Sequence, residues 1–82
     1  MSADRIIATY KTKAAPPRVA EARCEASARG AMLWTGQLAL GHPAYWVTLP
    51  AEIAEPLQVL RVVAAVDAAL GVRTPRLVKG FA

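Results

Sequence analysis

The sequence contains few of the residues that most catalytic and metal-binding sites require. Its 82 residues include one cysteine, one histidine and no glycine-rich phosphate-binding loop. A nucleophilic site built on Cys24 or a serine would therefore depend on His42 alone, which stands beside a proline in a predicted turn. Structural zinc sites take four Cys or His ligands, more than this chain supplies. We therefore expect no catalytic site, no metal and no cofactor, and we expect that the protein is not an enzyme.

The scarcity of cysteine and of long apolar runs also bears on where the protein works. Cys24 has no second cysteine to pair with, which favours a reducing compartment. The longest stretch without a charged residue, 30–51, is interrupted by glycines, prolines and polar residues, so we expect no membrane span there. The opening Met-Ser-Ala-Asp-Arg lacks the basic-then-apolar layout of a signal peptide. The expected location is the cytoplasm.

The chain has many hydrophobic residues, but a large share of them have small side chains. Hydrophobic residues make up 55% of the chain, and 18 of them are alanines. A chain of this length buries only about 60% of the surface of its unfolded form. We therefore expect one domain, residues 1–82, with a thin core. The net charge of +4 suits nucleic acid, an acidic protein surface or simple solubility.

The segment 5–13 has the pattern of a β-strand. Its β-branched and aromatic residues alternate with polar ones, which predicts Ile6, Ala8 and Tyr10 on one face and the two lysines on the other. The pair Pro16–Pro17 then breaks the pattern, because proline donates no backbone hydrogen bond and restricts the residue before it.

The segment 18–29 fits two structures. As a strand it would place alternate small residues, Cys24 among them, on one buried face, with the charged residues opposite. As a helix it would start with Pro17 in the first turn and would pair Glu25 with Arg29. Alanine favours the helix, but the helical wheel has no large apolar anchor. The alternation favours the strand, and the helix remains the alternative.

A β-hairpin and a helix are predicted in the second half. The segments 31–40 and 44–49 are rich in bulky residues and flank the turn 41–43, with Gly36 as a candidate bulge. The two tryptophans are predicted to belong to the core; exposed, they would offer surfaces for base stacking.

The predicted helix begins near Pro56 and ends at Gly71. Its apolar stripe consists of Val59, Val63, Val66 and Leu70, widened by Leu57, Leu60 and Ala64. A short edge strand is predicted within 76–81. The expected fold is a small α+β domain, an antiparallel sheet of three to five strands with one helix packed on one face.

Cations and aromatic residues supply the candidate partner-binding side chains. The cations of 11–29 would share the open face of the first two strands, and those of the tail would form a second basic run. Interfaces are enriched in Trp, Tyr and Arg, and phosphate contacts also need cations. The candidates are Lys11, Lys13, Arg18, Arg23, Arg29, His42, Trp46, Arg73, Arg76 and Lys79. Three hypotheses follow: a protein-binding module, a small nucleic-acid-binding protein, and a homodimeric structural protein joined through its apolar helix.

Two parts of the chain resemble small phage and prophage accessory proteins of the anti-CRISPR kind. They are Ile-Ile-Ala-Thr-Tyr-Lys-Thr-Lys followed by Pro-Pro-Arg-Val-Ala-Glu-Ala-Arg-Cys-Glu-Ala-Ser-Ala-Arg-Gly, within 5–30, and the Ala/Val helix of 56–71. The resemblance implies a non-enzymatic inhibitor in a bacterial host that docks on a CRISPR-Cas surveillance complex and blocks target DNA binding or nuclease recruitment. Many such inhibitors are acidic DNA mimics, whereas this chain is basic. Its positive charge favours binding to an acidic protein surface.

Overall fold

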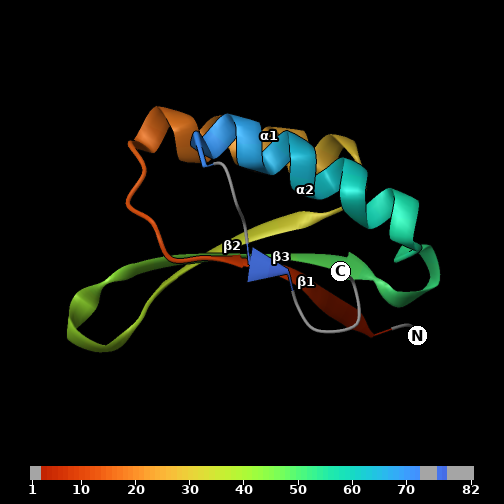
Figure 1. The fold of residues 1–82 in the computed structure, drawn as a ribbon, viewed down its shortest axis with the longest axis horizontal. Coiled ribbons are helices and arrows are strands. Elements are labelled where there is room, and N and C mark those ends of the chain that lie inside the picture. The colour runs from red at the N-terminus through yellow and green to blue at the C-terminus, as the bar shows by residue number, and fades with distance from the viewer. Residues whose placement is uncertain (1–2, 73–75, 78–82) are drawn as a thin grey trace.

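A computed structural model describes residues 3–72 and 76–77 as a β-sheet with two helices on one side (Figure 1). The elements in chain order are β1 (Asp4–Tyr10), α1 (Pro16–Ala28), β2 (Met32–Gln37), β3 (Pro43–Pro50), α2 (Pro56–Leu70) and β4 (Arg76–Leu77). Single turns of 3-10 helix, Ala39–Gly41 and Ala51–Ile53, lie before and after β3. The α+β class is confirmed. The predicted single helix is wrong, because there are two.

The four strands lie in the order β2-β3-β1-β4, and every neighbouring pair is antiparallel. With the chain order β-α-β-β-α-β, this is the split βαβ arrangement of ferredoxin-like folds. Each helix connects two strands that have a third strand between them, and both crossovers pass on the same side of the sheet (Figure 1). As a result one face of the sheet is covered by both helices and the other by neither.

Strand β1 forms as predicted, but a bulge changes which residues share a face. The register with β3 shifts between Ile6 and Ala8, which leaves Ile7 as an extra residue. Ile7 and Ala8 are both fully buried, and Ile6 is exposed. The prediction that Ile6 shares a face with Ala8 and Tyr10 is therefore wrong, because a bulge reverses the alternation on one side of it.

The segment 18–29 is helical, so the strand prediction is wrong. Pro16 and Pro17 occupy the first turn of α1, where proline fits without loss of a hydrogen bond. Ala22 and Ala26, one turn apart, are fully buried, and these two methyl groups replace the missing large anchor. Cys24 is exposed rather than buried, because it lies on the outer side of the helix.

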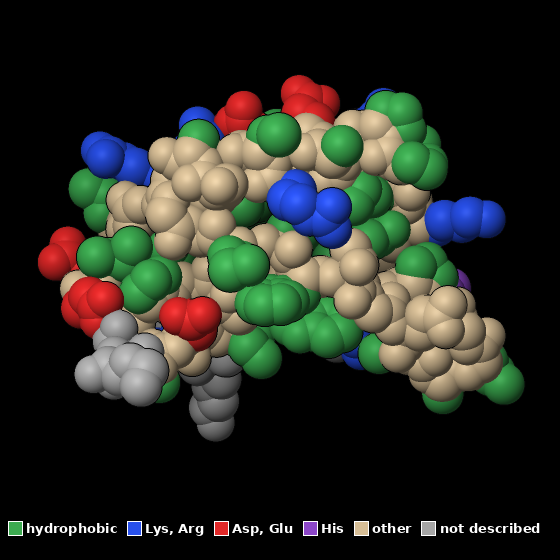
Figure 2. Space-filling view, turned by 180° about the vertical axis from the view of Figure 1, so that it is seen from behind, with side chains coloured by type: hydrophobic (Ala, Val, Ile, Leu, Met, Phe, Trp, Pro, Cys, Tyr) green, Lys and Arg blue, Asp and Glu red, His purple; other side chains and the backbone are tan. Residues whose placement is uncertain are grey.

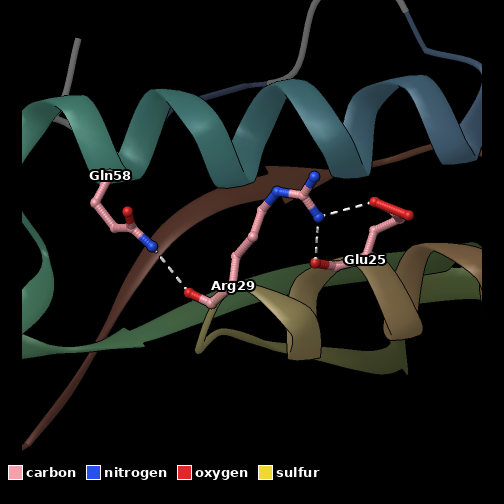
Figure 3. A network of polar contacts seen from close by, with 3 residues as sticks. All are labelled: Glu25, Arg29 and Gln58. Carbon is pink, nitrogen blue, oxygen red and sulfur yellow. Dashed lines mark hydrogen bonds and ion pairs between the residues drawn. The ribbon is translucent and has the colours of Figure 1, made fainter.

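The two helices are joined by a polar contact at the C-terminal end of α1 (Figure 3). The guanidinium of Arg29 donates to Glu25 Oε2 at 2.8 Å and to the Glu25 carbonyl at 2.9 Å. The side-chain amide of Gln58, on α2, donates to the carbonyl of Arg29 at 2.9 Å. The predicted i,i+4 pair is thus present, and its arginine also anchors α1 to the neighbouring helix.

Helix α2 begins and ends as predicted. Pro56 is in its first turn, and Gly71 ends it with a positive φ of 76°, which glycine adopts without strain. The stripe from Val59 to Leu70 is buried, but its three predicted flanking residues, Leu57, Leu60 and Ala64, are exposed. Within residues 3–72 and 76–77, neither helix combines the length and the apolar character that crossing a bilayer would require.

Replacing a buried alanine of α1 tests the close approach of this helix to the core. Ala22→Leu is expected to lower the free energy of unfolding by about 1–3 kcal/mol, because three extra carbon atoms have no space. Ser27→Leu is the matched control, since Ser27 is exposed on the same helix. Urea denaturation of both variants measures the difference; equal stabilities would contradict this packing of α1.

Candidate functional site

The face of the sheet that the helices leave open has a distinct chemical character. Figure 1 shows both helices on the same side of the sheet, above it in that view. The register places side chains from three strands on this face, since residues directly opposite one another share a face. The eight central residues of this face are Ile6, Thr9, Met32, Trp34, Gly36, Ala44, Trp46 and Thr48. Asp4 and Pro50 continue the face at one end, and Arg76 of β4 pairs with Thr9.

Large apolar side chains on this face are exposed. The exposed fraction is 43% for Trp34, 52% for Met32 and 44% for Ile6. Trp46 is half-buried beside them. Single exposed apolar residues are ordinary, but a contiguous group on one face marks an interaction surface. The predicted core role of the tryptophans is therefore wrong for Trp34, because the hairpin register turns both indoles away from the helices.

Both indoles are held in place by their neighbours. Trp34 Nε1 donates a hydrogen bond of 2.8 Å to Thr48 Oγ1 on the adjacent strand. The Trp46 ring covers Gly36, where a Cβ atom would overlap it. The predicted bulge at Gly36 is wrong, because the register of β2 with β3 is regular. Glycine is required there for the close approach of the ring.

A hollow of about 240 Å³ lies beside Trp46 on the same face. Its lining is almost entirely apolar and includes Ile6 and Leu38. Among the described residues that line it, Lys11, which follows β1, is the one with a charge. The eight central positions of the face carry no charged side chain. The face is therefore apolar at its centre, with a cation at its rim.

The tip of the β2–β3 hairpin projects beyond the sheet. Leu40 is fully exposed and has a positive φ of 64°, which is uncommon for a leucine. His42 is exposed at the same tip, and its carbonyl accepts a hydrogen bond of 2.7 Å from the Leu38 N–H. The tip thus presents His42 apart from the other candidate residues.

The predicted cations do not share the open face. Lys11 and Lys13 follow β1, whereas Arg18, Arg23 and Arg29 lie on α1, in the layer on the other side of the sheet. The prediction that these five share one face fails because 18–29 is a helix. Figure 2 shows cationic side chains that stand apart from one another, with acidic side chains among them at the top and lower left.

The three arginines of α1 have different surroundings. Arg29 is engaged by Glu25 (Figure 3). Arg18 lies against Gly71, at the C-terminal end of α2, where the helix dipole favours a cation. Arg23 is exposed and makes no ion pair within the part of the chain that the structure describes. Arg23 is therefore the arginine of α1 best placed to meet a partner.

Three candidate cations lie in the C-terminal tail. Arg76 belongs to β4, and its Cα pairs with that of Thr9 on β1. This confirms a short edge strand at the start of the predicted range 76–81. Arg73 and Lys79 lie outside the described residues.

Two titratable groups are perturbed, and both belong to the side covered by helices. Burial raises the pKa of Tyr10, and the charge of Asp67 raises it further. Burial also raises the pKa of Asp67, whose Oδ1 is buried without a hydrogen-bond partner. The Tyr10 hydroxyl approaches the Val63 carbonyl at 3.5 Å. Within residues 3–72 and 76–77, no three His, Cys, Asp or Glu side chains gather as metal ligands would.

Comparisons with protein-family models, curated proteins and solved structures find no match to this chain. The resemblance to anti-CRISPR proteins therefore stays a prediction. The split βαβ arrangement hosts many unrelated functions, so it does not by itself indicate one. The function has to be argued from the chemistry of the surfaces.

Substitution of Gly36 tests how the open face is built. Gly36→Ala is expected to displace the Trp46 ring and to lower the free energy of unfolding by about 1–3 kcal/mol, because the new methyl group overlaps the indole. The indole N–H resonance of Trp46 should shift in NMR spectra. Gln37→Ala, the next residue of the same strand, serves as the control; an unmoved Trp46 resonance in Gly36→Ala would contradict the packing.

Proposed function

We propose that this chain is a non-catalytic protein-binding module and that the open face of its sheet is the binding surface. One observation carries the proposal: Trp34, Met32 and Ile6 are exposed together on a face that neither helix covers. Tryptophan and methionine are enriched in the cores of protein interfaces, and tryptophan is the most frequent hot-spot residue. Burial of these side chains against a partner is the main gain that the face offers.

Charge favours a protein over a nucleic acid on this face. Binding to nucleic acid draws most of its affinity from cations that neutralise phosphates. The eight central positions of the face have no charged side chain, and Lys11 is the cation among the described residues that line the adjoining hollow. Aromatic stacking on bases normally accompanies a basic groove. A neutral apolar face gains more from an apolar protein surface.

The fixed orientation of the indoles also suits a binding surface. Trp34 is held by Thr48, and Trp46 is held against Gly36, so neither ring has to lose much rotational freedom on binding. Preorganisation of this kind improves affinity because less entropy is lost when the complex forms. The hollow beside Trp46 offers space for an apolar side chain of the partner.

The alternatives for this face predict different solution behaviour. We expect the purified chain to be monomeric by light scattering, with tryptophan fluorescence unchanged by short single-stranded oligonucleotides at physiological ionic strength. Quenching that falls with added salt and is lost in Trp34→Ala would assign the face to nucleic acid. A dimer that Met32→Glu dissociates would assign it to a second copy. Either result contradicts a heterologous protein partner.

The resemblance to anti-CRISPR proteins extends the proposal to a named class of partner. On this view the partner is the CRISPR-Cas surveillance complex of a bacterial host, and the bound chain blocks DNA binding or nuclease recruitment. Expression of the chain in a CRISPR-active host is then expected to restore phage plaquing.

Two matched variants connect that assay to the open face. Met32→Glu should weaken binding at least about tenfold, because an unpaired carboxylate would be buried in the interface. Leu60→Glu is the control, since Leu60 is exposed to a similar extent, 53% against 52%, but lies on α2. Restored plaquing that both variants retain would place the inhibitory surface elsewhere. Failure of the folded wild-type protein to restore plaquing in the hosts tested would remove their effector complexes as partners.

A further inference from the structure

The edge strand β2 has backbone groups that no other strand within residues 3–72 and 76–77 engages. In every β2–β3 pair the two residue numbers have the same sum, so the register is constant along the ladder. The hydrogen bond from the Leu38 N–H to the His42 carbonyl continues this register. In an antiparallel ladder hydrogen-bonded and non-hydrogen-bonded pairs alternate, so the even-numbered residues of β2 bond to β3. The odd-numbered residues Leu33, Thr35 and Gln37 therefore direct their N–H and C=O groups outward. Pro43, opposite Gln37, fits this assignment because it has no N–H to donate.

This edge lacks the features by which proteins usually protect one. Edge strands are commonly short, bulged, or interrupted by proline or charged residues. Strand β2, Met-Leu-Trp-Thr-Gly-Gln, has six residues in regular register, with no proline and no charge. The open backbone groups span about 14 Å, the length of four steps along a strand. That length accommodates an added strand of about five residues.

Two grooves follow the same edge beneath α1. One, of about 510 Å³, is bordered by Thr35 and Gln37, and the other, of about 230 Å³, by Leu33. Helix α1 borders them with the small side chains of Ala20 and Ser27 and with the larger ones of Pro16, Val19 and Arg23. The grooves therefore lie where alternate side chains of an added strand would enter.

Arg23 is the charged residue of both grooves. It contributes to the lining of each, and none of the described residues that line the two grooves has a carboxylate. Glu21 and Glu25 lie about 200° around the helix from Arg23, on the opposite side, and Glu25 is paired with Arg29.

We propose that the β2 edge binds an extended segment of another protein that carries an acidic side chain. The segment adds a fifth strand through the backbone groups of Leu33, Thr35 and Gln37, and its carboxylate pairs with Arg23. Strand addition of this kind takes affinity from main-chain hydrogen bonds and specificity from pockets for alternate side chains. A second copy of this chain fits less well, because antiparallel pairing of two β2 edges would bring two Arg23 side chains together.

The test uses a blocked peptide, acetyl-Thr-Val-Glu-Val-Thr-amide, and the same peptide with Gln in place of Glu. Titration followed by NMR should show exchange protection for the amides of Leu33, Thr35 and Gln37 on binding. The amides of Met32, Trp34 and Gly36, already bonded to β3, should keep their protection unchanged. The Gln peptide should bind about tenfold more weakly, since it lacks the charge-assisted contact.

Three variants separate strand addition from other kinds of binding. Arg23→Glu should lose the Glu peptide and gain a peptide with Lys at that position, whereas Arg61→Glu, an exposed arginine of α2, should behave as the wild type. Thr35→Pro should block binding but keep the fold, because its N–H points outward.

The proposal is overturned if the Glu and Gln peptides bind equally or if neither protects the three outward amides. It is also overturned if those amides are already protected in a dimer without peptide. Ile6 is exposed on the open face but lies on β1 and lines neither groove, so Ile6→Glu should leave peptide binding unchanged; the two proposals can therefore fail separately.

Discussion

The structure depends on the packing of both helices against one face of the sheet. Helix α1 contacts the core through the methyl groups of Ala22 and Ala26, which are fully buried, and through the partly buried Val19. Each buried methyl-sized group contributes only about 0.8 kcal/mol, so the contact is stabilised by closeness and number rather than bulk. The valine stripe of α2 supplies the volume that α1 lacks. The core therefore lies between the helices and one side of the four-stranded sheet, and neither helix covers the other side.

The distribution of charge follows from the same arrangement. The charged residues of α1 lie on a helix, so they are divided between the flank that meets α2 and the flank above β2. Glu25 and Arg29 lie on the first and serve the helix pair, while Arg23 lies on the second and has no such partner. The eight central positions of the open face have no charged side chain. The molecule therefore presents two unlike surfaces, one neutral and one with a single cation beside free backbone groups.

Strong local signals made much of the fold predictable from sequence. Strand β1, the hairpin and α2 with its ends at Pro56 and Gly71 follow from alternation, turn residues and capping. Helix α1 was not predictable from its pattern, because alanines at alternate positions also include the pair 22 and 26, one helical turn apart. When every buried residue is small, the pattern of small residues does not distinguish the helical period from the strand period. Helix propensity then decides. The bulge in β1 leaves no mark in the sequence, although it decides on which face Ile6 lies.

The candidate site was predictable only in part, for a related reason. Trp46 and Lys11 were identified as candidates, and both border the hollow on the open face. The sequence predicts Trp34 in the core, but the structure exposes it. Whether odd- or even-numbered residues of the hairpin face the helices depends on the register, and a run of bulky residues does not reveal it. The arginines of 18–29 were placed with the lysines because the segment was taken as a strand. Because the segment is a helix, Arg23 lies at the grooves beside the β2 edge and not on a face of the sheet. Its neighbours there are residues of β2 and α1, not the lysines.

Strand β2 belongs to both surfaces because a strand has a period of two. Its even-numbered residues turn their side chains to the open face, where Trp34 lies, and their backbone groups to β3. Its odd-numbered residues turn their side chains toward the helix layer, as buried Leu33 does, and their backbone groups to the edge. A strand added beside Thr35 would extend the open face by one strand next to Trp34. A single protein partner with an apolar surface and an adjoining acidic extended segment could therefore occupy both surfaces at once, without any rearrangement of the fold.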